Sequence, residues 1–508
     1  MQPLYTISDI RHIEHTASAR LSTGTLMQRA GQAAAHAALS LLRPPYHVES
    51  VLVLAGPGNN GGDALEAARH LDQAGCMVTV LLIADPESQP MDARTALELA
   101  RRGNLRFTTL DKFILESTAW SLVIDGLFGI GLGRPIPANL HAVIRHVNGL
   151  SCPVLALDIP SGLHADTGAV IGDIAVRATH TITFIGDKPG LHTASGRDHA
   201  GTVRVDRLEI DSLLYPAARI RLNSPQLFQG ALRARRHDSH KGSYGNVTVV
   251  GGGAGMGGAA ILAARAALHA GAGRVVAAFV DNPPPYDSLQ PELMCVSAAS
   301  ATFQSTVVVA GPGLGQSRAS QEALSRALAS TASTAQSVVL DADALNMIAA
   351  NPRLHQQLAG RSSHFVMTPH PLEAARLLGI TTANVQADRI GTARRLADRF
   401  NAVIVLKGSG TIIAAPETPA VINPTGNPAL ATGGTGDVLA GLCGALLAQD
   451  CSPINAALAA VWVHGSASDA LVARGIGPVG MTASEVIGEA RRLLNEMVTD
   501  ESRKPYHR

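Results

Sequence analysis

Short apolar runs alternate with longer segments of helical period along most of this chain of 508 residues. The runs are uninterrupted and rich in valine and leucine, which is typical of strands buried on both faces of a parallel sheet. Helices between such strands cover the sheet on both sides, so the pattern predicts α/β units. In the first half we predict two helices within 8–42, helices near 64–74, 91–101 and 138–148, strands at 51–55, 77–83, 121–125 and 153–158, and edge strands at 181–186 and 202–208.

The alternation lapses within residues 209–240 and then starts again. No short repeat relates the halves, so we predict two different α/β domains, residues 1–215 and 241–508, joined by a linker at 216–240. In the second half the predicted strands are 246–251, 274–280, 305–311, 337–341, 364–368 and 402–408, and the predicted helices lie near 436–449, 453–472 and 483–496.

Composition narrows the possible classes of function. Forty-one Lys and Arg residues nearly balance 40 Asp and Glu, and aromatic residues make up 3% of the chain, which argues against a nucleic-acid partner. The five cysteines form no CxxC pair and no zinc-ligand spacing, as in proteins of a reducing compartment. The N-terminus lacks the layout of a signal peptide, and the uncharged segment 247–264 holds six glycines, typical of a strand, loop and helix. We therefore expect a soluble, cytoplasmic protein without a membrane partner.

One glycine-rich stretch, residues 423–441, has the sequence NPTGNPALATGGTGDVLAG. Gly and Thr at 432–436 predict a tight turn with exposed backbone amides where a helix starts, which suits a phosphate group. Asp437 then falls in the first helical turn, where it would act as a base toward a hydroxyl beside the phosphate. A lone Asp at such a position is more commonly a helix cap, which is the alternative interpretation.

Polar side chains also follow three predicted strands of the first half, in the loops GPGNNGGD (56–63), DGLFGIGLGRP (125–135) and DIPSG (158–162). Ligands of parallel α/β sheets bind at the carboxyl ends of strands, so the loops predict a shared pocket, although each acid alone would be a helix cap. No GK[ST] follows the glycines, which excludes a Walker A loop. Oxygen ligands from Asn60, Asp125 and Ser161 suit a hard cation, and with one charge among them we expect a monovalent ion.

Together with LMQRAG at 26–31, these motifs resemble the NAD(P)H-hydrate epimerase family over residues 5–210. The resemblance implies that K⁺ is held by Asn60, Asp125 and Ser161, and we hypothesise that Asp158, aided by K⁺, is the catalytic group that moves protons. The implied substrate-binding residues are Asn59, Asn60, Gly61, Gly62, Asp63, Gly129, Ile130, Gly131, Leu132, Gly133, Arg134, Pro135 and Asp158. Ala64 and Ile130 stand where glycine and threonine are usual, which bears on the rate of this activity but removes no ligand.

The second half contains a GxGxxG pattern at Gly253, Gly255 and Gly258, with Asp281 at the end of the next predicted strand. That is a dinucleotide-binding signature. The other strand-end motifs favour a different family. In chain order HKGSYG, GPGLG, DADALN, TPHPLE and KGSGT precede the 423–441 stretch, and together they resemble the NAD(P)H-hydrate dehydratase family, which has a ribokinase-like fold, over residues 225–500.

By this resemblance the hydrated nicotinamide nucleotide contacts Ala259, Gly313, His370 and the catalytic Asp437. The nucleotide that donates phosphate is held by Lys407, Gly408, Ser409, Gly410, Thr411 and Gly436. Gly315 is an alternative to Gly313, and Leu372 stands where glycine is usual after His-Pro. Taken singly, His370 would be interpreted as a surface or core histidine and Lys407 as a solvated lysine.

The implied protein is a multifunctional enzyme of metabolite repair, an isomerase and a lyase. A Rossmann-like αβα domain epimerises hydrated NADH and NADPH (NADHX and NADPHX), and a ribokinase-like αβα domain dehydrates the S form. Hydroxide leaves poorly, so phosphorylation by ADP with Mg²⁺ first activates it and leaves AMP and phosphate. The residues do not distinguish ADP from ATP.

Three other interpretations stay open: a small-molecule kinase with an N-terminal binding module, a nicotinamide-dependent oxidoreductase, and a binding protein in which one half is inactive. We expect small-molecule substrates and a homo-oligomer, in which the apolar helix at 26–42 is either an interface or a core helix.

Overall fold

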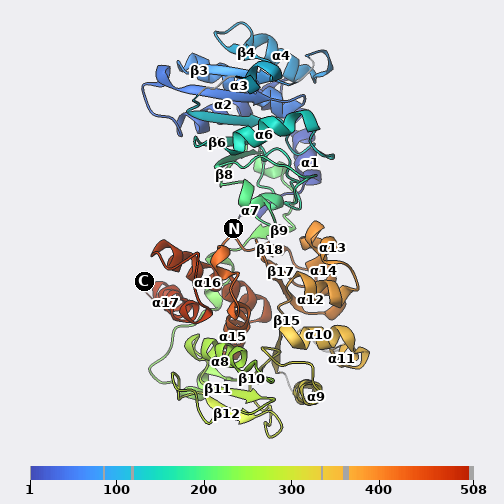
Figure 1. The fold of residues 1–508 in the computed structure, drawn as a ribbon, viewed down its shortest axis with the longest axis vertical. Helices are drawn as coiled ribbons and strands as arrows, with labels where there is room; N and C mark the ends of the chain where they lie inside the picture. The colour runs from blue at the N-terminus through green and yellow to red at the C-terminus, as the bar shows by residue number, and fades with distance from the viewer. Residues whose placement is uncertain (1, 84–85, 116–118, 333–335, 359–364, 503–508) are drawn as a thin grey trace. The chain divides into compact units, whose positions relative to one another are not determined.

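The computed structural model of this protein describes residues 2–83, 86–115, 119–332, 336–358 and 365–502. The described residues fold into two compact units, one of Pro3–Ile220 and one that begins at Arg221 and also includes Gln2. They run from blue to green and from green to red in Figure 1.

The described part of the first unit contains a sheet of seven strands in the order β4-β3-β2-β5-β6-β7-β8. All neighbours are parallel, and Val53 of β2, the third strand in this order, pairs with Val80 on β3 and Ile124 on β5. The elements of this unit are β1 (Pro3–Leu4), α1 (Ile7–Ser18), α2 (Thr25–Leu39), β2 (Ser50–Ala55), α3 (Asn59–Gln73), β3 (Met77–Leu82), α4 (Met91–Ala100), β4 (Arg106–Thr108), α5 (Leu110–Leu115), β5 (Leu122–Gly126), α6 (His141–Asn148), β6 (Val154–Leu157), β7 (His180–Phe184), α7 (Gly196–His199) and β8 (Thr202–Asp206).

Helices cover this sheet on both faces. Because side chains alternate along a strand, Val51 and Val53 pack in one cluster with α1 to α4, and Leu52 and Leu54 pack in another with α6. All four side chains are fully buried. The three-layer αβα arrangement predicted from the uninterrupted apolar runs is confirmed.

The apolar helix expected within 26–42 is α2, and its small residues face its own unit. Ala30, Ala34 and Ala38 are buried in the core cluster of α1 to α4. A Cβ added at Gly31 would lie 2.2 Å from Cβ of Glu66, so α2 and α3 pack too closely there for any larger residue. Of the two interpretations, interface or core helix, the packing supports the core helix.

The second unit contains a mixed sheet in the order β9-β18-β17-β16-β15-β14-β13-β10-β11-β12, parallel from β12 to β16 and antiparallel at β16-β17-β18. Its strands are β9 (Ile220–Leu222), β10 (Asn246–Gly251), β11 (Arg274–Phe279), β12 (Met294–Ser297), β13 (Val307–Ala310), β14 (Ser337–Leu340), β15 (Phe365–Met367), β16 (Val403–Leu406), β17 (Ile412–Ala414) and β18 (Ala420–Ile422).

The helices of the second unit form two groups (Figure 1). One group is α8 (Gly257–His269), α15 (Thr435–Ala448), α16 (Pro453–Ala473) and α17 (Ala483–Ser502). The other is α9 (Arg318–Ala332), α10 (Ala342–Ala350), α11 (Pro352–Leu358), α12 (Pro371–Leu378), α13 (Thr382–Ala387) and α14 (Arg389–Phe400).

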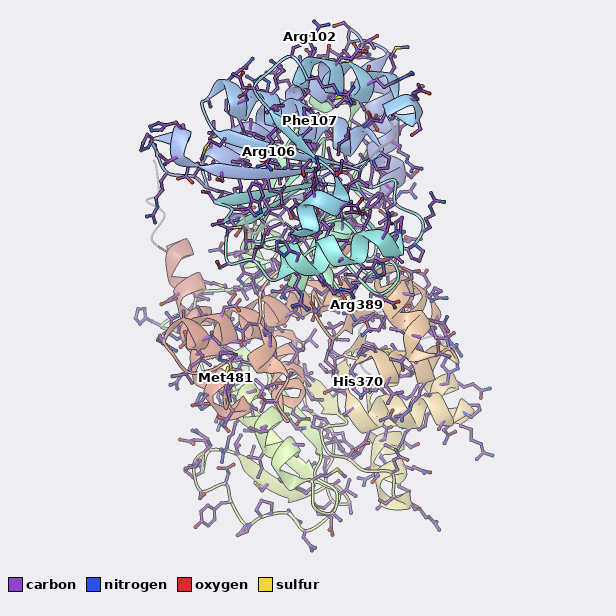
Figure 2. The ribbon with its side chains drawn as sticks, turned by 45° about the horizontal axis from the view of Figure 1, so that its top comes forward. Arg102, Arg106, Phe107, His370, Arg389 and Met481 are labelled. Carbon is purple, nitrogen blue, oxygen red and sulfur yellow. The ribbon has the colours of Figure 1, made fainter. Side chains whose placement is uncertain are left out.

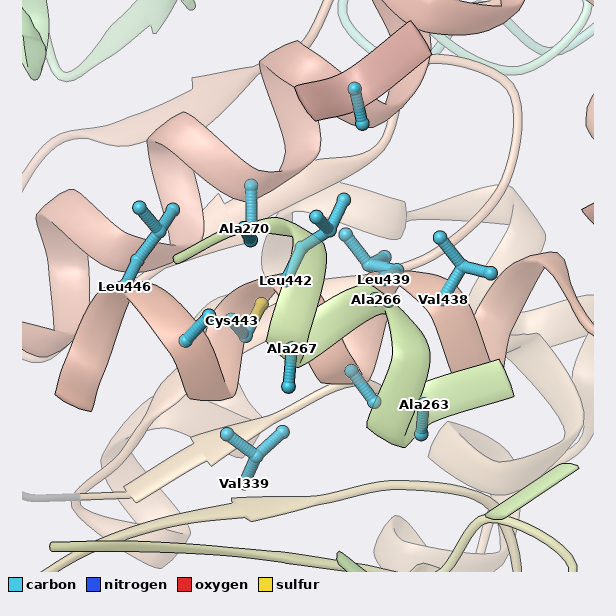
Figure 3. Packing of buried hydrophobic residues seen from close by; sticks show 14 of the residues in the cluster. Ala263, Ala266, Ala267, Ala270, Val339, Val438, Leu439, Leu442, Cys443 and Leu446 are labelled. Atoms are coloured by element: carbon cyan, nitrogen blue, oxygen red, sulfur yellow. The ribbon is translucent and has the colours of Figure 1, made fainter. Parts of the chain in front are cut away.

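Small residues bring α15 against both α8 and the sheet (Figure 3). A Cβ added at Gly441 would lie 2.1 Å from the carbonyl oxygen of Ala263 on α8. One added at Gly444 would lie 2.5 Å from Cγ2 of Val309 on β13. The helix is therefore held at backbone distance from its neighbours, which fixes the position of its N-terminal turn.

Several elements differ from the sequence prediction. Strand 181–186 was expected at an edge, but β7 lies between β6 and β8; the edge position of β8 is confirmed. The helix expected near 64–74 begins earlier, at Asn59. The sequence prediction also missed five strands of three or four residues each, namely β4, β9, β12, β17 and β18. Strands this short lack a readable alternation. Of the predicted strand 364–368, residue 364 lies outside the described residues.

Residues 216–240, predicted as a linker, include packed side chains. Phe228 and Leu232 are buried in the core of the second unit. The segment 247–264 forms β10, a loop and the start of α8, as predicted. Helix α16 is long and apolar enough to cross a membrane. However, 67% of its most apolar 18-residue segment is buried against the rest of its own unit, as in a core helix.

Candidate active sites

In the first unit, the predicted Asn59–Asp63 loop is the first turn of α3. Gly58 precedes it in an extended conformation. The side-chain nitrogen and oxygen of Asn60 are both buried without a hydrogen-bond partner in the structure. Gly61 and Gly62 serve packing, since added Cβ atoms would lie 2.0 Å from the oxygen of Gly56 and 2.5 Å from Cε of Met27. The family resemblance implies a substrate-binding role for both glycines; in the structure their missing side chains let neighbouring segments approach.

A cavity of about 510 Å³ opens at the carboxyl end of this sheet. The predicted residues that line it are Asn59, Asn60, Asp63, Gly129, Ile130, Gly131, Leu132, Gly133, Arg134 and Asp158. Gly131 and Gly133 face open space, with nothing within 4 Å of an added Cβ. Gly61, Gly62 and Pro135 do not line the cavity. Helix α1 adds Arg11, Glu14 and Ser18, which no motif indicated.

Asp125 and Ser161 form a buried network beside the cavity residues. The Ser161 hydroxyl donates to Oδ1 of Asp125 at 2.7 Å, and its backbone amide donates to Oδ2 at 2.8 Å. The amide of Phe128 donates to the same hydroxyl at 2.9 Å. Burial raises the pKa of Asp125 to about 6, although these hydrogen bonds oppose the shift. Among the described residues no cationic side chain forms an ion pair with this carboxyl.

Asp158 directly follows β6 and has a left-handed backbone, with φ of 64°. Its Oδ1 accepts from Nζ of Lys188 at 2.5 Å, and its Oδ2 accepts from the amide of Ile130 at 3.2 Å. Two other carboxyls share the cavity: burial, and then the charge of Asp158, raise the pKa of both Asp63 and Glu14. Three acids and one buried ammonium therefore meet here, an arrangement suited to proton transfer.

In the second unit, the predicted turn at the start of α15 is confirmed. Gly434 has φ of 92°, a conformation that favours glycine, and the helix begins at Thr435. The Thr435 hydroxyl donates to the carbonyl of Leu430 at 2.8 Å, which closes the turn. Asp437 lies in the first helical turn. Burial, with the charge of Asp341 adding to it, raises the pKa of Asp437 to about 7.

Lys407 brings three strand ends together. Its Nζ donates to Oδ1 of Asp341 at 2.6 Å, and the Thr368 hydroxyl donates to the same oxygen at 2.7 Å. A Cβ added at Gly436 would lie 3.5 Å from this Nζ, so the helical turn is next to the ammonium. Burial alone would lower the pKa of Lys407, but the carboxylates of Asp341 and Glu373 outweigh it and raise the pKa. A cation beside free helical amides is a phosphate-binding arrangement.

His370 caps α12. Its Nδ1 accepts from the amides of Leu372 and Glu373, so the proton of the neutral ring is on Nε2. Burial, with the charge of Lys407, lowers the pKa of His370. Its neighbour Glu373 is 3% exposed and lies 4.0 Å from Nζ of Lys407. In Figure 2 His370 lies in the yellow and orange part of the second unit, with Arg389.

Ala259 and Gly313 lie side by side, because a Cβ added at Gly313 would be 2.9 Å from Cβ of Ala259. Gly315 makes a different contact, because its backbone amide donates to Oδ2 of Asp343 at 2.8 Å. The GxGxxG loop contacts the segment around Gly313, because the backbone amide of Gly253 donates to the carbonyl of Gly313 at 2.7 Å. Of the three glycines of the dinucleotide-like pattern, Gly253 therefore packs one strand-end loop against the next, whereas a Cβ added at Gly255 or Gly258 would meet nothing within 4 Å.

Two family models match the chain: YjeF-related protein N-terminus over residues 23–190, and NAD(P)H-hydrate dehydratase over residues 247–492. The bifunctional NAD(P)H-hydrate repair enzyme Nnr of Escherichia coli (strain K12) is 39% identical over 97% of this chain and 94% of its own length. That of Coxiella burnetii is 38% identical over 97% of this chain and 100% of its own. The chain belongs to this bifunctional repair family.

A solved structure is similar to the second unit's fold. The ribokinase-like superfamily protein from Enterococcus faecalis V583 aligns with 56% of this chain and with 98% of its own chain, with a TM-score of 0.50 and 26% sequence identity.

Membership in the bifunctional NAD(P)H-hydrate repair family confirms both sequence resemblances, and the ribokinase-like assignment of the second unit with them. The oxidoreductase and kinase interpretations lose their support, because both halves match across nearly the whole length of full repair enzymes.

Sequence reasoning missed three buried charged residues of this repair-family chain: Lys188, Glu373 and Arg389. Arg389 is 2% exposed and donates to the carbonyls of Leu406 and Lys407, beneath the predicted nucleotide-binding turn at 407–411. Burial lowers the pKa of Arg389 to about 10. For Lys188 the available signal was a cation shortly after the apolar run 181–186, which a single sequence does not separate from a solvated side chain.

Proposed function

We propose that the first unit interconverts the R and S epimers of NADHX and NADPHX, and that the second unit dehydrates the S epimer with ADP as phosphate donor. The observation that carries this proposal is the pair of acids at the carboxyl ends of the two sheets. Asp158 lines a cavity in one unit, and Asp437 lies beside a phosphate-suited turn in the other. The relatives reported above are named bifunctional NAD(P)H-hydrate repair enzymes, and the family model that matches the second unit is named NAD(P)H-hydrate dehydratase.

In the second unit Asp437 accepts the proton of the C6 hydroxyl, whose oxygen then bonds to the terminal phosphorus of ADP as the bond to AMP breaks. Phosphate leaves from C6 and a proton leaves from C5, which restores the double bond of the nicotinamide ring. A pKa of about 7 suits Asp437 to this proton transfer near neutral pH. Lys407 and the amides of the α15 turn stabilise the charge on the phosphates.

Magnesium fits this site as a partner of the nucleotide. The described residues hold no cluster of three or more His, Cys, Asp or Glu side chains placed for a metal. Mg²⁺ is commonly held by substrate phosphates with one or two carboxylates. Glu373, whose pKa burial raises to about 7, and Asp341 are the two carboxyls beside Lys407 that would assist. When bound, the ion would neutralise phosphate charge.

In the first unit Asp158 moves the proton of the C6 hydroxyl, so that the centre opens or ionises and closes again. Potassium fits beside it on two observations: the amide oxygen of Asn60 is buried without a partner, and the buried Asp125 has no cationic partner among the described side chains. With Ser161 these side chains offer oxygen ligands and one charge. A bound K⁺ would supply the missing counter-charge.

The test is repair of racemic NADHX with ADP and Mg²⁺, followed as NADH absorbance at 340 nm, with ATP in a parallel reaction. We expect complete conversion. Conversion of half the substrate would mean a dehydratase without an epimerase, and no conversion would overturn the proposal. Faster conversion with ATP would change the donor but leave the reaction class. We also propose that the protein is a homo-oligomer, which gel filtration with light scattering tests.

A further inference from the structure

Lys188 is the buried cation of the first unit. Its side chain is 0% exposed. The ammonium makes three hydrogen bonds, to Oδ1 of Asp158 at 2.5 Å, to the hydroxyl of Thr183 at 2.7 Å and to the carbonyl of Phe184 at 2.7 Å. An ammonium has three N–H donors, so every donor is used within the protein. This leaves Lys188 no exposed atom and no free donor with which to contact a substrate.

The carboxyl that Lys188 binds is fixed but not enclosed. Asp158 is 14% exposed and lines the cavity. Its left-handed backbone, with φ of 64°, is a strained conformation for a residue other than glycine and needs surrounding contacts to hold it. Lys188 holds Oδ1, and the amide of Ile130 approaches Oδ2 at the longer distance of 3.2 Å. Oδ2 is therefore the oxygen available to a ligand.

We propose that Lys188 is a positioning residue of the epimerase, which fixes the Asp158 carboxylate so that Oδ2 meets the reacting hydroxyl. The inference rests on the proposed epimerase role of Asp158 and adds the group that aims it. A buried ammonium costs free energy unless it is paired and fully hydrogen-bonded, so a purely structural core would be served better by an apolar side chain. A base displaced by about 1 Å loses roughly 100-fold in rate, which sets the size of the expected effect.

The main experiment compares Lys188→Met with Lys112→Met in the full-length chain. Met keeps the length and apolar stem of lysine, and Lys112 is an exposed lysine of the same unit. Epimerisation of R-NADHX is measured without ADP by chromatography, and dehydration of S-NADHX with ADP at 340 nm. For Lys188→Met we expect epimerase kcat to fall about 100-fold with KM changed by less than about threefold. Dehydration, and both activities of Lys112→Met, stay unchanged.

Chemical rescue separates positioning from general stability. Lys188→Ala leaves a cavity beside Asp158 that ethylammonium fits, so we expect the added amine to restore epimerase kcat at least about tenfold, with tetramethylammonium, which has no N–H, inactive. Epimerase kcat within threefold of wild type in Lys188→Met would overturn the inference. So would loss of kcat in Lys188→Ala that no amine restores, since that describes a structural lysine. A wild-type chain without epimerase activity would instead overturn the proposed function.

Discussion

Both units contain a lysine–aspartate ion pair at strand ends. In the first unit the aspartate is the more exposed partner, and in the second unit it is the lysine. In the first unit the Lys188 side chain is 0% exposed and Asp158 is 14% exposed. In the second unit Lys407 is 20% exposed and Asp341 is 2% exposed. The first pair thus presents a carboxylate to its ligand, and the second presents an ammonium. One arrangement suits removal of a hydroxyl proton, and the other suits binding of phosphate.

A second difference follows from what each unit adds to its pair. The first adds Asn60, Asp125 and Ser161, a set of oxygen atoms without a cationic side chain. The second adds Asp437 on a helical N-terminus, where backbone amides supply partial positive charge. In the proposed mechanism the dehydratase site therefore separates its base, Asp437, from its ion pair, whereas in the epimerase site the proposed base, Asp158, is part of the pair. Substitutions in each pair should separate the two activities.

The largest expected effect is that of Asp437→Asn. It removes the base and leaves the turn intact, so we expect dehydration of S-NADHX to fall by about 1,000-fold or more, within the range for loss of a general base. Epimerisation of R-NADHX in the same preparation should stay within twofold. Asp398→Asn, at an exposed aspartate of the same unit, is the control. Dehydration above one-tenth of the wild-type rate would contradict the role of Asp437.

The converse substitution, Asp158→Asn, should lower epimerase kcat by roughly 100-fold or more, because the amide cannot accept the hydroxyl proton and no longer pairs with Lys188. In the time that the wild-type enzyme needs to repair all of the racemic NADHX, the variant should repair only half of it. Asp173→Asn, at an exposed site, controls for charge. An unchanged epimerase rate would show that Asp158 only binds.

The parts of these sites that the sequence predicts are those with a local pattern. Gly434 to Asp437 form one turn and one helix start, so residue type and spacing suffice. Lys188 and Asp158 are 30 positions apart, and no pattern near either residue indicates the other. The start of α3 was missed for another reason: Asn and Gly are poor helix formers, and here tight packing of Gly61 and Gly62 overrides that preference. Tertiary contacts decided both cases.

A smaller effect is expected for Lys407→Met. Loss of one charge-assisted phosphate contact should raise KM for ADP by about 30-fold, with epimerisation unchanged. Asp341 would be left buried without its cation, which destabilises the second unit by roughly 3–5 kcal/mol, so thermal unfolding is measured beside activity. Arg353→Met, at an exposed arginine of the same unit outside the named motifs, is the control. If kcat falls while KM for ADP stays constant, Lys407 acts in the chemical step and the contrast with Lys188 is weaker.

The smallest effect is the dependence of dehydration on pH. Burial raises the pKa of Asp437 from 3.8 to about 7, and only the ionised carboxylate accepts a proton. The competent fraction is then about one-tenth at pH 6 and about nine-tenths at pH 8, so kcat/KM for S-NADHX, which reports the free enzyme, should rise roughly ninefold between them. The charge of Asp343 contributes to this raised pKa, so Asp343→Asn should move the midpoint to lower pH. A profile that is flat or falls from pH 6 to 8 would mean that Asp437 is not the base that limits dehydration.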